Sequence, residues 1–153
     1  MLLTGGIGGD NTFGVLARMD EVLESWPRKI FLMIGINDLA RRFPNEVIIA
    51  NYRKIIQQIR LKSPRTKIYI QSVLPVYSKK AAGNYKTNNP LVLSLNENLK
   101  KFAKEQNITY INLYDFFADA NGELREELTR DGIHLYSKAY IIWVDYLKKN
   151  RFL

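Results

Sequence analysis

Cysteine is absent from this 153-residue chain, and histidine occurs only once, as His134. Without cysteine, the chain can form no disulfide, no thiolate metal site and no cysteine nucleophile. The absence of disulfides is compatible with either a reducing or an oxidising compartment. No apolar run is long enough to span a bilayer, so we expect no membrane partner.

The remaining composition is that of a soluble globular protein, with 46% hydrophobic and 25% charged residues. The length predicts one domain, residues 1–153. A net charge of +8 favours anionic partners in general. However, many of the basic residues lie on the solvated faces of expected amphipathic helices. No zinc-finger spacing, RNP-type aromatic motif or Gly-rich nucleic-acid loop is present. We therefore expect no nucleic-acid partner.

Apolar runs of strand length alternate with helical stripes along the chain. The expected strands are residues 29–34, 67–73 and 108–113, preceded by residues 1–4, which could form only the end of a strand. The expected helices are 12–26, 45–62, 90–106, a short segment within 114–127 and a last helix from Ser137, which is expected to cap it. This alternation predicts an α/β fold: a flavodoxin-like parallel sheet in three layers, with helices on both faces.

Two details of this pattern are specific enough to test. Val15, Met19, Val22 and Trp26 follow one helical stripe, so Trp26 is expected to face the core. Residues 76–89 are polar, have no periodicity and include three lysines. Such a long loop in a compact domain is usually a lid or binding loop, or else disordered.

The single histidine lies in the segment Asp131-Gly132-Ile133-His134. An imidazole can accept a proton near pH 7, and an aspartate on its far nitrogen fixes the tautomer and stabilises the imidazolium. The alternative is that His134 only caps a turn before the last helix. The Asp-x-x-His spacing alone favours this alternative, because such short motifs recur by chance.

Two other segments are expected at the same edge of the sheet, because ligands bind at the carboxyl ends of parallel strands. Gly9 can present a backbone N–H at the entrance to the first helix, and Asn37 carries an amide just past a buried strand. Two such donors directed at one point form an oxyanion hole. Each also has a purely structural interpretation: turn geometry for the glycines, and a helix cap or Asx-turn for Asn37-Asp38.

Taken together, Gly8-Gly9-Asp10, Gly35-Ile36-Asn37-Asp38 and Asp131-Gly132-Ile133-His134 resemble three conserved blocks of the SGNH, or GDSL-type, hydrolases. Their order and approximate spacing also match, over essentially the whole chain. The resemblance implies that Gly9 and Asn37 are oxyanion-hole donors, that His134 is the general base and that Asp131 orients it. It implies no metal and no cofactor. Gly8 stands where many members of the family have serine.

The Gly-Asp-Ser block that carries the family's nucleophile is absent from these residues. Ser72, late in an expected strand, is the nearest substitute, but it lacks the sharp turn that exposes a nucleophile. The resemblance also implies a missing central strand between the one ending near Thr4 and the one ending at Ile34. We therefore expect an N-terminally truncated domain with a gap or an unpaired apolar edge. Such a chain would form a homo-oligomer, exchange strands or rearrange its sheet.

The interpretation that accounts for most of these features is a serine-type ester hydrolase that acts on a small-molecule ester, such as a short acyl group on a sugar. As written, residues 1–153 would be inactive because the nucleophile is missing. The alternative is a non-catalytic pseudoenzyme or fragment that binds or assembles. A third interpretation, a basic nucleic-acid or phosphate binder, predicts a steep dependence of binding on salt.

Overall fold

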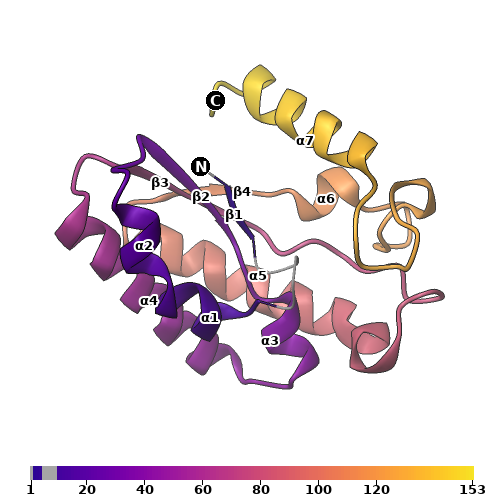
Figure 1. Cartoon of the computed structure of the whole chain (residues 1–153). Coiled ribbons are helices and arrows are strands. Elements are labelled where there is room, and N and C mark those ends of the chain that lie inside the picture. Colours follow the sequence, from indigo (N-terminus) through magenta and orange to yellow (C-terminus); the bar gives the residue numbers. More distant parts are fainter. Residues whose placement is uncertain (1, 5–9) are drawn as a thin grey trace.

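A four-stranded parallel sheet forms the centre of the computed structural model, which describes residues 2–4 and 10–153 (Figure 1). The strands are β1 (Leu2–Thr4), β2 (Lys29–Met33), β3 (Lys67–Gln71) and β4 (Thr109–Ile111), in the spatial order β1-β2-β3-β4. Because each strand pairs with the next one in parallel, each connection must cross over one face of the sheet.

Helices supply these crossovers and cover both faces of the sheet. They are α1 (Thr12–Ala17), α2 (Met19–Leu23), α3 (Ile36–Ala40), α4 (Asn45–Lys62), α5 (Asn88–Glu105), α6 (Tyr114–Phe117) and α7 (Ser137–Lys149), with 3₁₀ turns η1 (Gly83–Thr87) and η2 (Glu126–Leu128). Figure 1 shows α7 and α6 on one side of the sheet and the other helices on the opposite side. This arrangement confirms the predicted α/β fold.

The apolar run of β2 is continuous because both faces of the strand are buried. Ile30 and Leu32 belong to the larger core, which also includes residues of α1, α2, α4 and α5. Phe31 and Met33 point to the other face, into a smaller core formed with residues of α6 and α7. Alternate side chains of a strand point to opposite faces, so one strand contributes to two cores.

The sheet has no gap between β1 and β2. Leu2 pairs with Phe31, and Thr4 pairs with Met33, in direct parallel register. The gap expected for a missing central strand is therefore not found among the described residues, because β1 and β2 pair directly. Within the described residues, no further strand pairs with the other edge of β1. Oligomerisation through that edge stays a prediction.

The N-terminal helix differs from its prediction. Residues 12–26 form two short helices, α1 and α2, which meet at Arg18, where the N–H bonds to Val15 three residues back. The second helix ends at Leu23. Beyond it, Trp26 adopts a φ of +46° and is 74% exposed. The prediction that Trp26 faces the core is wrong, because the helical stripe stops one turn too early to bury it.

Three smaller differences follow from local hydrogen bonding and from tertiary contacts. Ser137 is the first residue of α7 and not its cap, and the preceding Tyr136 makes no side-chain capping bond. Asn37 and Asp38 lie inside the short helix α3, which the sequence pattern missed. Residues 76–89 contain η1 and are held by contacts described below.

In the part of the chain that the structure describes, no helix has both the length and the apolarity to cross a membrane.

Candidate active site

Asp131 and His134 form a hydrogen-bonded pair in the loop before α7. His134 Nδ1 lies 2.6 Å from Asp131 Oδ2, and the imidazole side chain is 60% exposed. Asp131 Oδ1 accepts the backbone N–H groups of Ile133 (2.9 Å) and His134 (2.8 Å). The carboxylate therefore closes an Asx-turn with one oxygen and binds the ring with the other, which leaves Nε2 as the outer ring nitrogen.

These hydrogen bonds determine the charge state of Asp131. Partial burial alone would raise the pKa of this carboxyl group. The bonds from the His134 ring and from the two backbone N–H groups outweigh that effect and lower the pKa of Asp131 to about 2. The carboxylate is therefore ionised across the neutral range, as an orienting partner of an imidazolium needs to be.

Gly132 attaches this loop to residues 77–81. Its carbonyl accepts the N–H of Tyr77 at 2.8 Å. Its φ is +89°, and a Cβ at this position would lie 2.6 Å from both the Tyr77 carbonyl oxygen and the Ala81 nitrogen. Only glycine allows this close approach of two backbones in this conformation.

Asn37 lies almost buried at the carboxyl end of β2, with 6% of its surface exposed. Its Nδ2 donates to the Asp10 carbonyl (2.6 Å), and its Oδ1 accepts the Tyr85 hydroxyl (2.6 Å). A backbone carbonyl can only accept, so the Asp10 contact identifies the amide's NH₂ end, and Tyr85 must be a donor. Among the described residues, Asp10 and Tyr85, both distant from Asn37 in sequence, therefore orient the amide.

Asp38 connects the same segment to the start of α1. It is fully buried and accepts the Thr12 backbone N–H (3.0 Å) and the Thr12 hydroxyl (2.5 Å). Asn51 in turn donates to the Thr12 hydroxyl at 2.9 Å. Burial raises the pKa of Asp38, and the bonds from Thr12 partly oppose this rise. Asn37 and Asp38 together bind residues 10 and 12, which directly follow the glycine loop in sequence.

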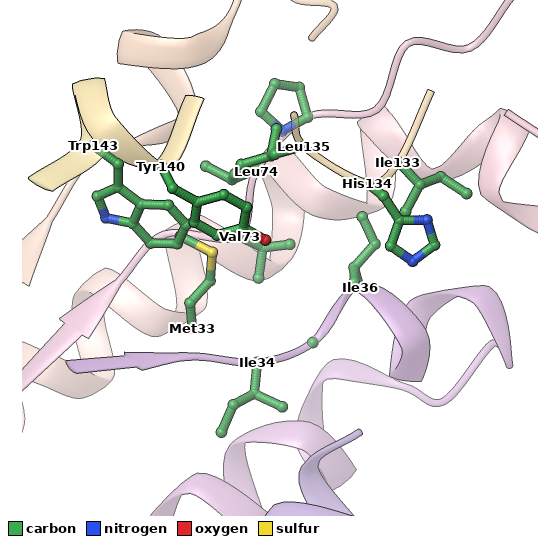
Figure 2. A pocket seen from close by; sticks show the side chains of 12 residues that line it. Met33, Ile34, Ile36, Val73, Leu74, Ile133, His134, Leu135, Tyr140 and Trp143 are labelled. Carbon is green, nitrogen blue, oxygen red and sulfur yellow. The ribbon is translucent and has the colours of Figure 1, made fainter. Parts of the chain in front are cut away.

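An apolar pocket of about 60 Å³ opens beside His134, at the carboxyl ends of β2 and β3. Its lining residues are Met33, Ile34, Gly35, Ile36, Val73, Leu74, Pro75, Ile133, His134, Leu135, Tyr140 and Trp143. Figure 2 shows the Tyr140 and Trp143 rings on the side opposite His134. Gly35 and Ile36, which immediately precede Asn37, share this pocket with His134. Segments near residues 35 and 134 therefore meet at one edge of the sheet, as the sequence predicts.

The other predicted elements of the site have different outcomes. Gly9 lies outside the described residues. Ser72 is fully buried, and its hydroxyl accepts the N–H groups of Leu113 and Tyr114, both at 2.8 Å. Its role is to hold the start of α6. Among the described residues, no serine hydroxyl is hydrogen-bonded to the His134 ring.

Residues 76–89 are attached to the rest of the site at several points. Asn89 makes two hydrogen bonds to Val76: its Oδ1 accepts the Val76 backbone N–H (2.8 Å), and its Nδ2 donates to the Val76 carbonyl (2.9 Å). The Glu123 carboxylate accepts from Ser78 and Asn89. Tyr85 reaches Asn37 from η1. Sequence reasoning missed Tyr85, because no local pattern connects a loop tyrosine to an asparagine 48 residues earlier.

Comparison with known proteins shows the family of this chain. The chain belongs to the GDSL-like Lipase/Acylhydrolase family, whose model matches residues 2–141. It is 28% identical to an arylesterase from Vibrio mimicus, over 87% of this chain and 60% of the relative. It is also 29% identical to an N-acylneuraminate cytidylyltransferase from Escherichia coli O18:K1:H7, over 80% of this chain and 28% of the relative. The chain thus spans less than two thirds of either relative.

A solved structure supports the same assignment. A candidate platelet activating factor from Streptococcus pneumonia is 28% identical and superposes with a TM-score of 0.81, over 92% of this chain and 67% of that one. The predicted resemblance to the GDSL-type hydrolases is therefore confirmed, and the acylhydrolase and esterase family is shown.

Proposed function

We propose that this chain forms the base and oxyanion side of a serine-type ester hydrolase, with His134 as general base, Asp131 as its orienter, and Asn37 and Gly9 as oxyanion-hole donors. The observation that carries this proposal is the 2.6 Å His134–Asp131 pair at the mouth of an apolar pocket whose wall leads directly into Asn37. In this reaction a serine hydroxyl attacks the ester carbonyl, and His134 Nε2 accepts its proton. Water then releases the acyl group, without metal or cofactor.

The pocket and the relatives indicate the kind of ester. A volume of about 60 Å³ has room for a few atoms, which suits a short acyl group such as acetyl. One relative is an arylesterase, and another is named for an N-acylneuraminate, an acylated sugar acid. We therefore propose a short acyl ester of a carbohydrate or another small alcohol as the substrate.

We further propose that residues 1–153 alone have no nucleophile. The buried, doubly bonded hydroxyl of Ser72 supports this proposal, because an attacking group must reach the substrate. The second candidate function, a non-catalytic binding or assembly module, is favoured by the same observation.

The test is p-nitrophenyl acetate hydrolysis by residues 1–153, by His134→Ala and by Ser72→Ala. We expect none of the three rates to exceed that of free imidazole at the same concentration. A rate above this background that falls in His134→Ala would contradict the absence of a nucleophile, and a similar fall in Ser72→Ala would identify that hydroxyl.

A second measurement separates the enzyme from the binding module. A chain extended at its amino end with the reading frame that precedes Met1 is assayed if that frame encodes Gly-Asp-Ser. We expect turnover and covalent labelling by a fluorophosphonate at the new serine, both lost in its Ser→Ala variant, and turnover lost in His134→Ala. An extended, folded chain whose turnover is unchanged in His134→Ala would overturn the assigned base.

A further inference from the structure

Trp26 is exposed in a way that the fold does not explain. Its side chain is 74% exposed, and its backbone has a φ of +46°, a conformation that bulky L-residues rarely adopt. Its N–H closes the end of α2 by donating to Leu23. Glycine would serve there without strain. In the described part of the chain, its ring makes no aromatic contact. Among the described residues, no ring or cation–π contact compensates for the strain and the exposed indole.

A groove beside Trp26 lies at the amino ends of β2 and β3, opposite the edge that holds His134. Its lining residues are Trp26, Pro27, Arg28, Lys29, Lys62, Ser63, Pro64, Arg65 and Lys67. Two X-Pro-Arg turns, residues 26–28 and 63–65, form its walls. The Thr66 hydroxyl donates to the Pro27 carbonyl (2.5 Å), and the Lys67 N–H donates to the Arg28 carbonyl (2.9 Å). The fixed φ of the two prolines and these two hydrogen bonds restrict the conformation of the groove.

The groove is cationic. Of its lining residues that the structure describes, five are Lys or Arg and none is acidic. Lys62 is paired with Asp20, Lys29 donates to the Phe152 carbonyl, and Lys67 lies 5.3 Å from the Tyr69 ring. Within the described residues, the guanidinium groups of Arg28 and Arg65 take part in no ion pair, hydrogen bond or ring contact. A guanidinium presents a planar fork that binds carboxylates with two parallel bonds.

We propose that this groove binds an acidic oligosaccharide, with a sugar ring stacked on Trp26 and its carboxylates bound by Arg28 and Arg65. The face of an indole is negative and attracts the C–H hydrogens of a sugar ring. This groove lies apart from the pocket beside His134. Binding of an acidic oligosaccharide here would be a second function, and it does not depend on the proposed ester hydrolysis.

Two other polyanions fit the groove less well. Single-stranded nucleic acid is bound by successive aromatic platforms along a basic track. Among the described lining residues of this groove, Trp26 is the one aromatic residue. Membrane attachment through tryptophan and basic residues needs an apolar face laid into the lipid interface. The charged lining of a concave groove does not provide such a face.

Trigalacturonate is the probe, with maltotriose as its uncharged counterpart, titrated by calorimetry in 50 mM NaCl. We expect trigalacturonate to bind and maltotriose to bind at least tenfold more weakly. Trp26→Ala and the double variant Arg28→Gln/Arg65→Gln should each weaken trigalacturonate binding at least tenfold. Lys100→Gln/Lys104→Gln removes the same charge from exposed positions on α5, and we expect it to change binding less than twofold.

Circular dichroism of each variant checks that it is folded. The proposal is overturned if trigalacturonate does not bind, or if both double variants weaken binding equally, which would indicate only net charge. It is also overturned if a twelve-residue oligothymidylate, or vesicles containing phosphatidylserine, bind more tightly than trigalacturonate and lose that binding in Trp26→Ala.

Discussion

The two sides of the candidate site are built in different ways. On the base side, the contacts described for the Asp131 carboxylate are with residues two and three positions further along the chain. On the oxyanion side, Asn37 and Asp38 bond to Asp10, Thr12 and Tyr85, which are 26 to 48 residues away. The base side is exposed and its geometry is local. The oxyanion side is buried and depends on the whole sheet.

This difference predicts which side of the site tolerates substitution without loss of stability. Exposed, locally bonded groups gain little from their contacts because water competes for them. A buried amide or carboxylate that loses a partner pays the full cost of desolvation. We expect the oxyanion side to couple to global stability and the base side to be nearly independent of it, with Gly132 as the exception.

The largest expected effect comes from Gly132→Ala. The φ of +89° and the 2.6 Å approach of a Cβ to the backbone of residues 77 and 81 both oppose the substitution. We expect a loss of about 3 kcal/mol in the free energy of unfolding, measured by urea denaturation. Gly83→Ala is the matched control: its φ is +56° and no atom lies near its Cβ, so we expect about 1 kcal/mol. Equal losses would show that the base loop does not need its attachment to residues 77–81.

Tyr85→Phe removes the hydroxyl that donates to Asn37 Oδ1. We expect a loss of about 1 kcal/mol in unfolding free energy. We also expect a change in the ¹H–¹⁵N resonances of the Asn37 side-chain amide, because its acceptor end loses its donor. Tyr136→Phe, at an exposed position, should change neither quantity. Unchanged Asn37 resonances in Tyr85→Phe would show that the Tyr85 hydroxyl does not orient the amide.

The smallest effect is expected from Asp131→Asn, and it should depend on pH. The folded pKa of about 2 lies below the ordinary value of 3.8, so the folded state binds the proton less readily than the unfolded state. The stabilisation from this group is therefore complete above about pH 4 and is lost as the pH falls through about 2. Because the side chain is 43% exposed, we expect less than about 1 kcal/mol.

Urea denaturation at pH 5, 4 and 3 measures this dependence. We expect the stability of the native chain to fall more steeply with acid than that of Asp131→Asn, whereas Asp145→Asn, at an exposed position on α7, should follow the native chain. Parallel curves for Asp131→Asn and the native chain would contradict a lowered pKa for Asp131.

Most elements of the fold could be predicted because their signals are periodic. The stripe Ile48, Tyr52, Ile55 and Ile59 is buried along α4 as expected, and the run in β2 faces two cores. The predictions were wrong where hydrophobic periodicity does not indicate where a helix ends or is too short to detect. The helix through Trp26 stops at Leu23, and α3 is too short to show a period.

The sequence by itself determined the Asp131–His134 pair, because an Asx-turn and an i, i+3 contact need only neighbouring residues. It also determined the layered α/β arrangement, because alternating apolar runs can be buried in few other ways. Only the tertiary structure decided that Tyr85 donates to Asn37, that Ser72 is buried under α6, and that β1 pairs directly with β2. Those contacts join segments distant in the chain, and no local pattern records which distant groups will meet once the core has closed.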